Sequence, residues 1–238
     1  MIDFHSHVLP KMDDGSKSGE ESVALLEAAF DQGLEGVFAT PHFYPKRDDP
    51  ESFLRRREHS AKSLFAGEAD VLKKMPLYLG AEVAYFYGMS RYEKLSELSL
   101  GGSDYILIEM PFDRWTSDEV DEILYFRNVS GLTPVLAHFE RYLPFGNKKY
   151  LRLFLQGDVL LQSNAEFFIG KKSRRKAFSY FKKGYVCLLG SDCHNTETRP
   201  ENYGEATEII KGCKKGAMLS SIVESERSIV SRCVPFSL

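Results

Sequence analysis

Short apolar runs alternate with longer amphipathic stretches along the chain. Seven runs have the composition of strands, and several of them are nearly continuous apolar segments bounded by Gly or Pro, as buried parallel strands tend to be. These predicted strands are residues 2–5, 37–42, 77–83, 105–110, 134–138, 159–164 and 186–192.

Between the predicted strands, apolar side chains recur at helical spacing. Residues 20–32, 117–129 and 173–183 form three such stretches, and each stops at or near a glycine that suits a helix C-cap. The charged stretch 49–74 predicts one long helix, and residues 203–215 predict another.

The alternation of strand and helix predicts an α/β fold with a parallel sheet, open or closed into a barrel. Seven strands favour a barrel with one unit missing over an open sheet. No internal repeat, low-complexity tract or linker divides the 238 residues. Because α/β barrels use roughly 200–250 residues as one unit, we expect a single domain over residues 1–238.

Composition and charge narrow the classes of function. A net charge of −3 argues against a broad nucleic-acid interface. No apolar run approaches the roughly 18 residues needed to span a bilayer, and the first residues lack the pattern of a signal peptide. The four cysteines form no C-x-x-C pair, which is typical of reduced thiols. We therefore expect a cytoplasmic protein without membrane insertion.

Metal-ligating and other polar residues stand at or near the end of every predicted strand. In parallel α/β folds, ligands and catalytic groups gather at the carboxyl ends of strands. Convergence of His, Asp and Glu from many strand ends is what a multinuclear metal site requires. The residues at these positions are His5, His7, His42, Glu82, Glu109, His138, Asn164, Asp192 and His194.

The types of ligating side chain limit which metals the site could bind. Imidazole together with carboxylate suits Mn, Fe, Zn or Ni, whereas Ca or Mg prefers oxygen alone. His5 and His7 are two residues apart, so in an extended segment both side chains lie on one side. Asp192 and His194 share this spacing, which would turn Cys193 away. A carboxylate such as Glu82 can bridge two ions, and such a pair forms a hydrolytic centre.

Each of these residues also has an ordinary structural interpretation. A lone H-x-H is as often a pair of surface or core histidines as a pair of metal ligands. His42, which follows Thr40 and Pro41, could stand in a turn. Glu82 and Glu109 are harder to explain in this way, because an unpaired carboxylate inside an apolar strand costs several kcal/mol. Since nearly every strand end carries such a group, we favour the metal site.

Further polar residues follow the strands closely. Asp14 is within reach of a metal, whereas Asp13 fits a turn before Gly15 equally well. Arg141 lies three residues after His138, and Arg199 follows the last predicted strand, 186–192. Guanidinium groups bind phosphate through two parallel hydrogen bonds. Alone, each arginine is more often a surface ion pair, but beside a metal centre both are candidate phosphate-binding residues.

Aromatic and basic clusters complete the candidates. Residues 85–87, with two tyrosines and a phenylalanine, suit the lining of the site mouth and ordinary packing equally well. The basic stretches 55–57 and 171–176 lie in polar helical patterns, so we interpret them as solvated faces. As an alternative, the second stretch could bind an acidic partner or substrate segment.

Cys193 and Arg199 also match C-x5-R, the spacing used by cysteine-dependent phosphatases. Those loops hold phosphate with backbone amides in a Gly-rich turn, which lowers the pKa of the thiol. Here the loop contains no Gly, and Pro200 follows the arginine. We therefore give the cysteine mechanism little weight.

Taken together, the motifs resemble the PHP (polymerase and histidinol phosphatase) superfamily. More narrowly, the chain is similar to the manganese-dependent protein-tyrosine phosphatases of bacterial capsule and exopolysaccharide synthesis. Phe139 departs from the family, which usually has Pro between His and Glu in its H-x-E-R motif. The matching segments, in family order, are residues 3–7, 13–16, 39–42, 80–82, 109–111, 137–142 and 190–195.

The resemblance implies a distorted (β/α)7 TIM-like barrel of the PHP fold and a site for two to three divalent ions, with Mn preferred and Fe, Zn or Ni as alternatives. One ion would be held by His5, His7, Glu82 and Asp192. Glu82 would bridge to a second ion held by Glu109 and His138. The third ion would be held by Asp14, His42 and His194.

The implied activity is hydrolysis of phosphotyrosine by a metal-bridging hydroxide, with Arg141, Arg199 and Asp192 as the catalytic residues and the two arginines binding the phosphate. The substrate would be a cytoplasmic tyrosine kinase of the polysaccharide system, and a homo-oligomer is known for some family members. Two alternatives stay open: a phosphatase of small phosphomonoesters such as histidinol phosphate, and a non-catalytic metal-binding partner of a kinase.

Overall fold

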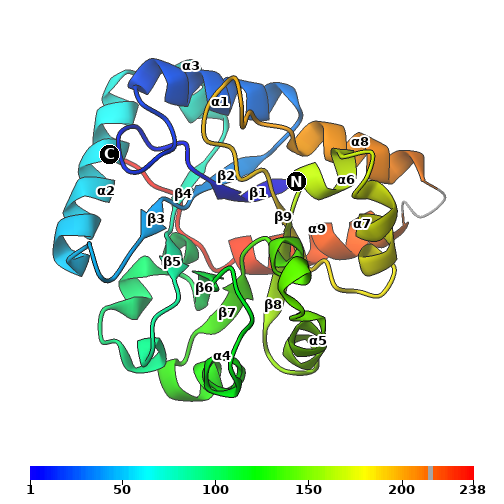
Figure 1. Ribbon diagram of the computed structural model, residues 1–238. Coiled ribbons are helices and arrows are strands. Elements are labelled where there is room, and N and C mark those ends of the chain that lie inside the picture. The colour runs from blue at the N-terminus through cyan, green and yellow to red at the C-terminus, as the bar shows by residue number, and fades with distance from the viewer. Residues whose placement is uncertain (214–216) are drawn as a thin grey trace.

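The central sheet is curled into a distorted barrel in which every paired strand runs parallel to its neighbour (Figure 1). The computed structural model describes residues 1–213 and 217–238. The strands are β1 (Ile2–Ser6), β2 (Gly36–Ala39), β3 (His42–Phe43), β4 (Leu77–Leu79), β5 (Glu82–Ala84), β6 (Tyr105–Glu109), β7 (Thr133–Leu136), β8 (Leu160–Asn164) and β9 (Leu188–Gly190).

Two of the seven predicted strands are interrupted. β2 and β3 are separated by Thr40 and Pro41, and β4 and β5 by Gly80 and Ala81. Because β2 pairs with β4 and β3 pairs with β5, the two broken strands lie side by side above and below their interruptions. Pro41 has no amide hydrogen to donate to a ladder, which accounts for one of the breaks. Counting each broken strand once gives the seven predicted strands in chain order.

The ring closes between the first and last strands. The amide of Asp192 donates to the carbonyl of His5 at 2.7 Å, and the amide of His7 donates to the carbonyl of Cys193 at 2.9 Å. The predicted barrel with seven strands is therefore confirmed.

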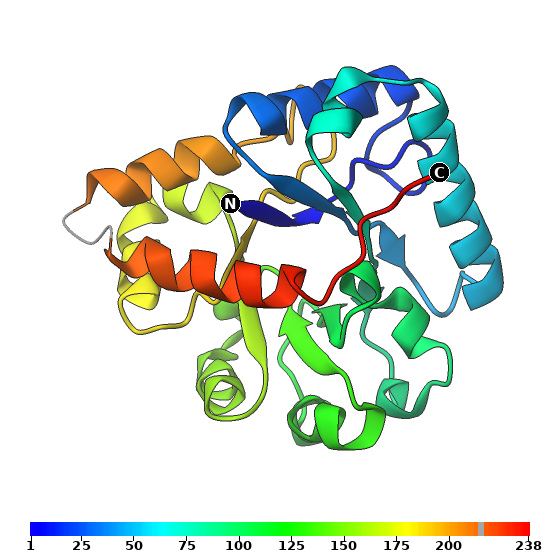
Figure 2. The ribbon, with the colours of Figure 1, turned by 180° about the vertical axis from the view of Figure 1, so that it is seen from behind.

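Helices surround the sheet in Figure 1. Figure 2 shows the barrel from behind, where α9 crosses its end. The short 3-10 helices are η1 (Met89–Arg91), η2 (Leu95–Leu98), η3 (Leu100–Gly102) and η4 (Phe139–Phe145). No helix in the described part of the chain is both long and apolar enough to cross a membrane. The α-helices are α1 (Gly19–Asp31), α2 (Pro50–Ala66), α3 (Asp70–Lys74), α4 (Ser117–Ser130), α5 (Lys148–Gln156), α6 (Glu166–Ile169), α7 (Arg174–Phe181), α8 (Tyr203–Gly212) and α9 (Ala217–Val230).

The helix predictions hold for α1, α4 and α7, each within two residues at either end. α4 starts one residue after its N-cap Thr116, whose side chain forms a capping box with Glu119. The prediction of one helix over 49–74 is wrong. α2 ends at Ala66, Glu68 adopts a left-handed φ of 52°, and α3 begins only at Asp70. A left-handed residue cannot continue a right-handed helix.

The remaining helix prediction, 203–215, corresponds to α8 as far as Gly212. Its last two positions, 214 and 215, lie outside the described residues.

The barrel interior is filled by side chains, so its chemistry is confined to the ends. Phe38 stacks on Phe4 with ring centroids 4.6 Å apart and on Tyr78 at 4.8 Å. Leu107, Val135 and Leu188 from three further strands join this cluster, and Ile229 of α9 packs against it. The carboxyl ends of the strands lie at the end of the barrel away from α9, and they stay available for polar groups.

One basic residue that we interpreted as solvated has a structural role. Arg57 donates to the carbonyl of Gly80 at 2.7 Å and to the carbonyl of Glu97 at 3.0 Å. It therefore holds the interruption between β4 and β5 in place. Burial lowers the pKa of Arg57 to about 10, which leaves it charged at neutral pH. The prediction of a solvated face is correct for its exposed neighbours Arg55 and Arg56.

The second basic stretch divides in the same way. Arg174 donates to the carbonyls of Phe168 and Ile169 at the end of α6, whereas Lys171, Lys172 and the residues at 175 and 176 are exposed.

We expect Arg57→Met to lower the free energy of unfolding by about 2–3 kcal/mol, because the carbonyl groups of Gly80 and Glu97 both lose a charged donor. Urea denaturation measures this change. Arg55→Met on the same helix is the matched control and should stay within about 0.5 kcal/mol of the wild type. Equal stabilities of the two variants would contradict the role assigned to Arg57.

Candidate metal centre

A β-bulge in β1 directs the first two histidines toward the mouth of the barrel. The register between β1 and β2 shifts between Asp3 and Ser6, and the Asp3 carboxylate accepts the amide of His5 at 3.0 Å. A bulge re-aims the side chains that follow it. Phe4 can therefore pack in the barrel interior while His5 approaches His7, with their Nε2 atoms 3.2 Å apart.

Two further candidate residues have left-handed backbones at the ends of their strands. His138 has a φ of 31° and Asp192 a φ of 55°. Such conformations are costly for residues other than glycine and tend to cluster at functional sites. The expectation that 192–194 is extended is wrong at Asp192, but Cys193 does point away and is fully buried in the core.

The Glu82 carboxylate is the centre of the cluster. Glu82 is only 1% exposed, yet no cationic Lys or Arg neutralises it in the described part of the chain. Instead, its two oxygens face imidazole nitrogens of His138 at 2.8 Å, His42 at 3.0 Å and His5 at 3.1 Å. His7 Nε2 follows at 3.4 Å.

The possible ligand atoms at and around this carboxylate fall into further groups. His5, His7 and Asp192 form one group, and His42, Glu82 and Glu109 form another. The third group is His7, Asp14, His42 and His194, in which the Asp14 carboxylate lies 3.5 Å from His194 and 3.6 Å from His42. The structure thus brings together the nine residues that the sequence singles out as ligands: His5, His7, Asp14, His42, Glu82, Glu109, His138, Asp192 and His194.

The donor set fits divalent transition metals. Each group mixes imidazole nitrogen with carboxylate oxygen, the combination that suits Mn, Fe, Zn or Ni. Nδ1 of His138 and Nε2 of His194 are buried without a hydrogen-bond partner, and Nδ1 of His42 and Oε2 of Glu82 lie 3.0 Å apart without forming a hydrogen bond. Since buried polar atoms are normally satisfied, these orphaned atoms support a site for cations.

The electrostatics of the cluster follow from burial of opposite charges. Burial disfavours the ionised form of Glu82 and of Asp192, but the surrounding imidazoles outweigh it and hold the pKa of both carboxyls well below the usual range. Burial opposes charge on His138 too, yet hydrogen bonds to Glu109 and Glu82 raise its pKa to about 10. Burial and the neighbouring imidazole of His7 lower the pKa of His194 to about 4.

Asp13, which the sequence left open as a turn residue, orients two of the histidines. Its carboxylate contacts Nδ1 of His7 at 2.7 Å and accepts the amides of His42 at 2.8 Å and Gly15 at 2.9 Å. Burial would lower the pKa of His7, but the Asp13 charge raises it well above its usual range. Asp13 is therefore both a turn residue and a carboxylate that orients an imidazole.

Gln162 of β8 is a further positioning residue, and sequence reasoning missed it. Its side-chain oxygen contacts Nδ1 of His5 at 3.2 Å and accepts the amide of His138 at 2.7 Å. Its amide nitrogen donates to Asn164 at 3.0 Å, which in turn donates to the Asp192 carboxylate at 2.7 Å. The alternation of Gln162 and Asn164 on one strand is a signal that could have revealed this chain of contacts.

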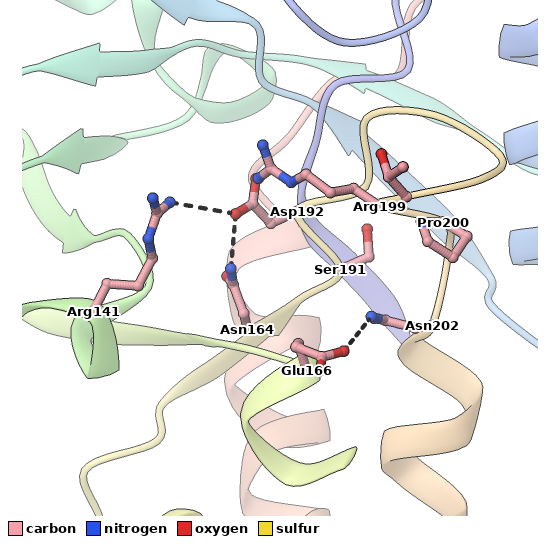
Figure 3. Close-up of a pocket in the computed structure, with 9 residues that line it drawn as sticks. Arg141, Asn164, Glu166, Ser191, Asp192, Arg199, Pro200 and Asn202 are labelled. Carbon is pink, nitrogen blue, oxygen red and sulfur yellow. Dashed lines mark hydrogen bonds and ion pairs between the residues drawn. The ribbon is translucent and has the colours of Figure 1, made fainter. Parts of the chain in front are cut away.

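Both candidate phosphate-binding arginines lie beside Asp192. Arg199 contacts one Asp192 oxygen at 2.7 Å and Arg141 approaches the other at 3.8 Å (Figure 3). Their side chains are 40% and 46% exposed, so both can reach a ligand in solution. The guanidinium of Arg141 also lies over the ring of Phe112 at 4.4 Å, which orients it by a cation–π contact.

The H-x-E-R segment has a separate task for each side chain. The half-buried Glu140 accepts the amide of Asn164 at 3.0 Å, and desolvation of its carboxyl raises its pKa to about 7. Phe139, which departs from the family pattern, is fully buried among Phe167, Tyr180 and Tyr185. The departure is therefore absorbed by the aromatic core.

The aromatic residues at 85–87 do not cluster at the strand ends. The Tyr85 hydroxyl donates to Glu122 of α4 at 2.9 Å, and Phe86 packs on Tyr92. Tyr87 is 84% exposed beside α4. Of their two interpretations, packing is correct for Tyr85 and Phe86. The aromatic residue that lies against Arg141 is instead Phe112.

The C-x5-R loop lacks the features of a cysteine phosphatase. The Cys193 thiol is fully buried, and burial raises its pKa well above the usual range. A phosphate-binding loop needs free backbone amides. Here the amides of Glu197, Thr198 and Arg199 all donate to the side-chain oxygen of Asn195. The loop is therefore closed around its own side chain.

Comparisons with known proteins agree on one family. The sequence model of "Capsular polysaccharide synthesis, CpsB/CapC" matches residues 1–227. Tyrosine-protein phosphatase CpsB of Streptococcus pneumoniae is 32% identical, over 97% of this chain and 98% of its own length. Tyrosine-protein phosphatase YwqE of Bacillus subtilis is 28% identical, over 89% of this chain and 84% of its own.

A similar fold is found among solved structures. A crystal structure from work on YwqE and CpsB, described as unique metal-dependent tyrosine phosphatases, superposes with a TM-score of 0.82. The match covers 99% of this chain and 96% of the other at 24% identity. At that identity, the likeness shows a shared fold.

We expect Asp13→Asn to weaken binding of Mn²⁺ by about 10–100-fold, because the imidazole of His7 loses the carboxylate that orients it. Calorimetric titration of metal-free protein with Mn²⁺ measures the affinity. Asp31→Asn, which removes the same charge from the exposed end of α1, should bind Mn²⁺ as the wild type does. Unchanged affinity in the Asp13 variant would contradict the role assigned to this carboxylate.

Proposed function

Because this chain belongs to the CpsB/CapC family of capsular polysaccharide synthesis, we propose that it is a metal-dependent protein-tyrosine phosphatase. The observation that carries the proposal is the juxtaposition of two charged assemblies. A buried cluster of imidazoles and carboxylates lies on one side of Asp192, and the guanidinium groups of Arg141 and Arg199 lie on the other. Hydrolysis of a phosphate ester needs both a source of activated water and positive charge around phosphorus.

The nine clustered side chains would hold two or three divalent ions, with manganese as the preferred metal. His5, His7, Glu82 and Asp192 would hold one ion, and Glu82 would also contribute to a second with Glu109 and His138. When bound, such ions lower the pKa of water and neutralise phosphoryl oxygens. Asp14, His42 and His194 would hold the third ion.

The arginines bind the non-bridging phosphate oxygens. Each offers paired N–H donors that match two oxygens at once, and each is anchored to Asp192 so that little side-chain freedom is lost on binding. The stack on Phe112 restricts Arg141 further. These contacts become stronger as negative charge spreads over the phosphoryl oxygens in the transition state.

A tyrosine phenolate is a suitable leaving group for this arrangement. Its pKa near 10 means that it departs without the strong general acid that an alkoxide requires. Both Arg141 and Arg199 are cationic, and neither is suited to give up a proton at neutral pH. The site therefore favours aryl phosphates.

The biological setting follows from the family. We propose that the substrate is a phosphotyrosine protein, a bacterial tyrosine kinase of capsule synthesis, and that the enzyme acts in the cytoplasm. Assembly into homo-oligomers belongs to the same proposal.

The test is phosphate release from a phosphotyrosine peptide. Activity should be lost on complete chelation and restored by Mn²⁺, and His138→Ala should reduce kcat/KM by roughly a hundredfold or more because a ligand is lost. Cys193→Ala is the matched control for mechanism and should retain activity.

Three results would contradict the proposal. Activity that survives chelation and disappears in Cys193→Ala would assign catalysis to the C-x5-R loop. A histidinol-phosphate rate far above the phosphopeptide rate would replace the substrate class. Stoichiometric binding of a kinase without turnover under any metal would make the protein a non-catalytic partner.

A further inference from the structure

A cavity of about 380 Å³ opens beside Asp192, away from the histidine cluster. Arg141, Arg199 and Asp192 line one part of it, and Glu166 at the start of α6 lines another (Figure 3). Its volume is at the lower end of the range for ligand sites. The remaining lining residues are Asn164, Ser191, Thr198, Pro200 and Asn202.

The two carboxylates that line this cavity, Asp192 and Glu166, differ in their partners. The Asp192 carboxylate is already engaged, by Arg199 at 2.7 Å and by the amide of Asn164 at 2.7 Å. Glu166 is different, because it is exposed and forms no ion pair with any residue that the structure describes. Its carboxylate accepts a long hydrogen bond of 3.5 Å from the side-chain amide of Asn202. The cavity therefore contains one carboxylate that lacks a cation.

The backbone holds Glu166 in place. The amide of the preceding residue, Ala165, donates to the carbonyl of Gly190 at 2.8 Å, which ties the start of α6 to the end of β9. The amide of Gly170 donates to the carbonyl of Glu166 at 3.0 Å, and Arg174 binds the carbonyls at the helix end. The carboxylate is thus presented from a fixed position close to Asp192.

We propose that this cavity is a substrate subsite in which Glu166 selects a cationic side chain, lysine or arginine, next to the phosphotyrosine. The inference rests on the proposed function, since it takes Arg141 and Arg199 as the residues that bind the phosphate. A phosphate bound there fixes one end of the substrate, and the neighbouring residue of the peptide then extends along the cavity toward Glu166.

The proposal predicts which charge the enzyme prefers on the residue next to the phosphotyrosine. The two arginines alone would favour acidic residues around the phosphotyrosine, because positive charge attracts them. Once the arginines are occupied by phosphate, the free charge that remains in the cavity is the carboxylate of Glu166. An acidic neighbour in the substrate is then repelled, and a lysine is attracted.

The experiment compares phosphotyrosine peptides in a glycine background that carry Lys, Gly or Glu one residue before or one residue after the phosphotyrosine. In the Mn²⁺-loaded wild type, we expect kcat/KM to be about two- to fivefold higher for Lys than for Glu at one of the two positions, the range for an exposed ion pair. In Glu166→Lys, this ratio should fall below one.

Glu205→Lys is the matched control, because it makes the same change in net charge at an exposed position of α8 that does not line the cavity. Its Lys-to-Glu ratio should equal that of the wild type. Affinities for peptides with a non-hydrolysable phosphonate in place of the phosphate should change in the same direction, which separates binding from turnover.

The outcomes distinguish the two proposals. Hydrolysis of all peptides without a Lys preference, or with a preference for Glu, overturns the subsite and leaves the phosphatase intact. An equal shift in Glu166→Lys and Glu205→Lys also overturns it, since net charge would then be the cause. Failure to hydrolyse any phosphotyrosine peptide under any metal overturns both.

Discussion

Burial of the Glu82 carboxylate is the constraint on which the rest of the site depends. An ionised carboxylate in the interior of a protein is tolerated only when opposite charge or strong hydrogen bonds compensate it. Glu82 has imidazoles of His5, His42 and His138 within 3.1 Å. These imidazoles share its burial, so the cluster as a whole depends on cations to satisfy its donor atoms.

Several unusual features of the backbone follow from this constraint. The bulge in β1, the interruptions in two strands and the left-handed conformations of His138 and Asp192 all occur where a strand delivers a side chain to the cluster. Each of them costs conformational stability. Part of this cost is offset by hydrogen bonds that Asp3 and Gln162 accept from the backbone amides of His5 and His138. Contacts of Asp13 with the His7 imidazole and of Gln162 with the His5 imidazole fix the two rings.

Much of this arrangement could be predicted from the sequence. Buried parallel strands are strongly apolar, so all seven were found. The metal-type residues at or near their ends predicted eight of the nine clustered positions, and Asp14, in the loop after the first strand, was the ninth. The resemblance to the PHP superfamily is borne out by the match to its CpsB/CapC members. The break between α2 and α3 was missed although Gly67 stands at the C-cap of α2, because the residue that turns left-handed is Glu68, a residue type that rarely does so.

Other features depend on contacts between distant residues. Arg57 appeared solvated because its partners, the carbonyls of Gly80 and Glu97, lie 23 and 40 positions away. Phe112 carries no metal-type chemistry, so only the folded chain shows that it orients Arg141. The alternation of Gln162 and Asn164 was a signal in the sequence, but it did not name His5 as the partner of Gln162. The cavity lined by Glu166 arises for the same reason from four separate segments.

The central claim is that the clustered side chains form a multinuclear metal centre around Glu82. Anomalous diffraction at the manganese edge, from crystals grown with Mn²⁺, tests it most directly. The account predicts two or three peaks, each about 2.0–2.3 Å from donor atoms of the nine residues, with Glu82 shared between two of them. Peaks confined to the protein surface, with none adjacent to Glu82, would contradict it.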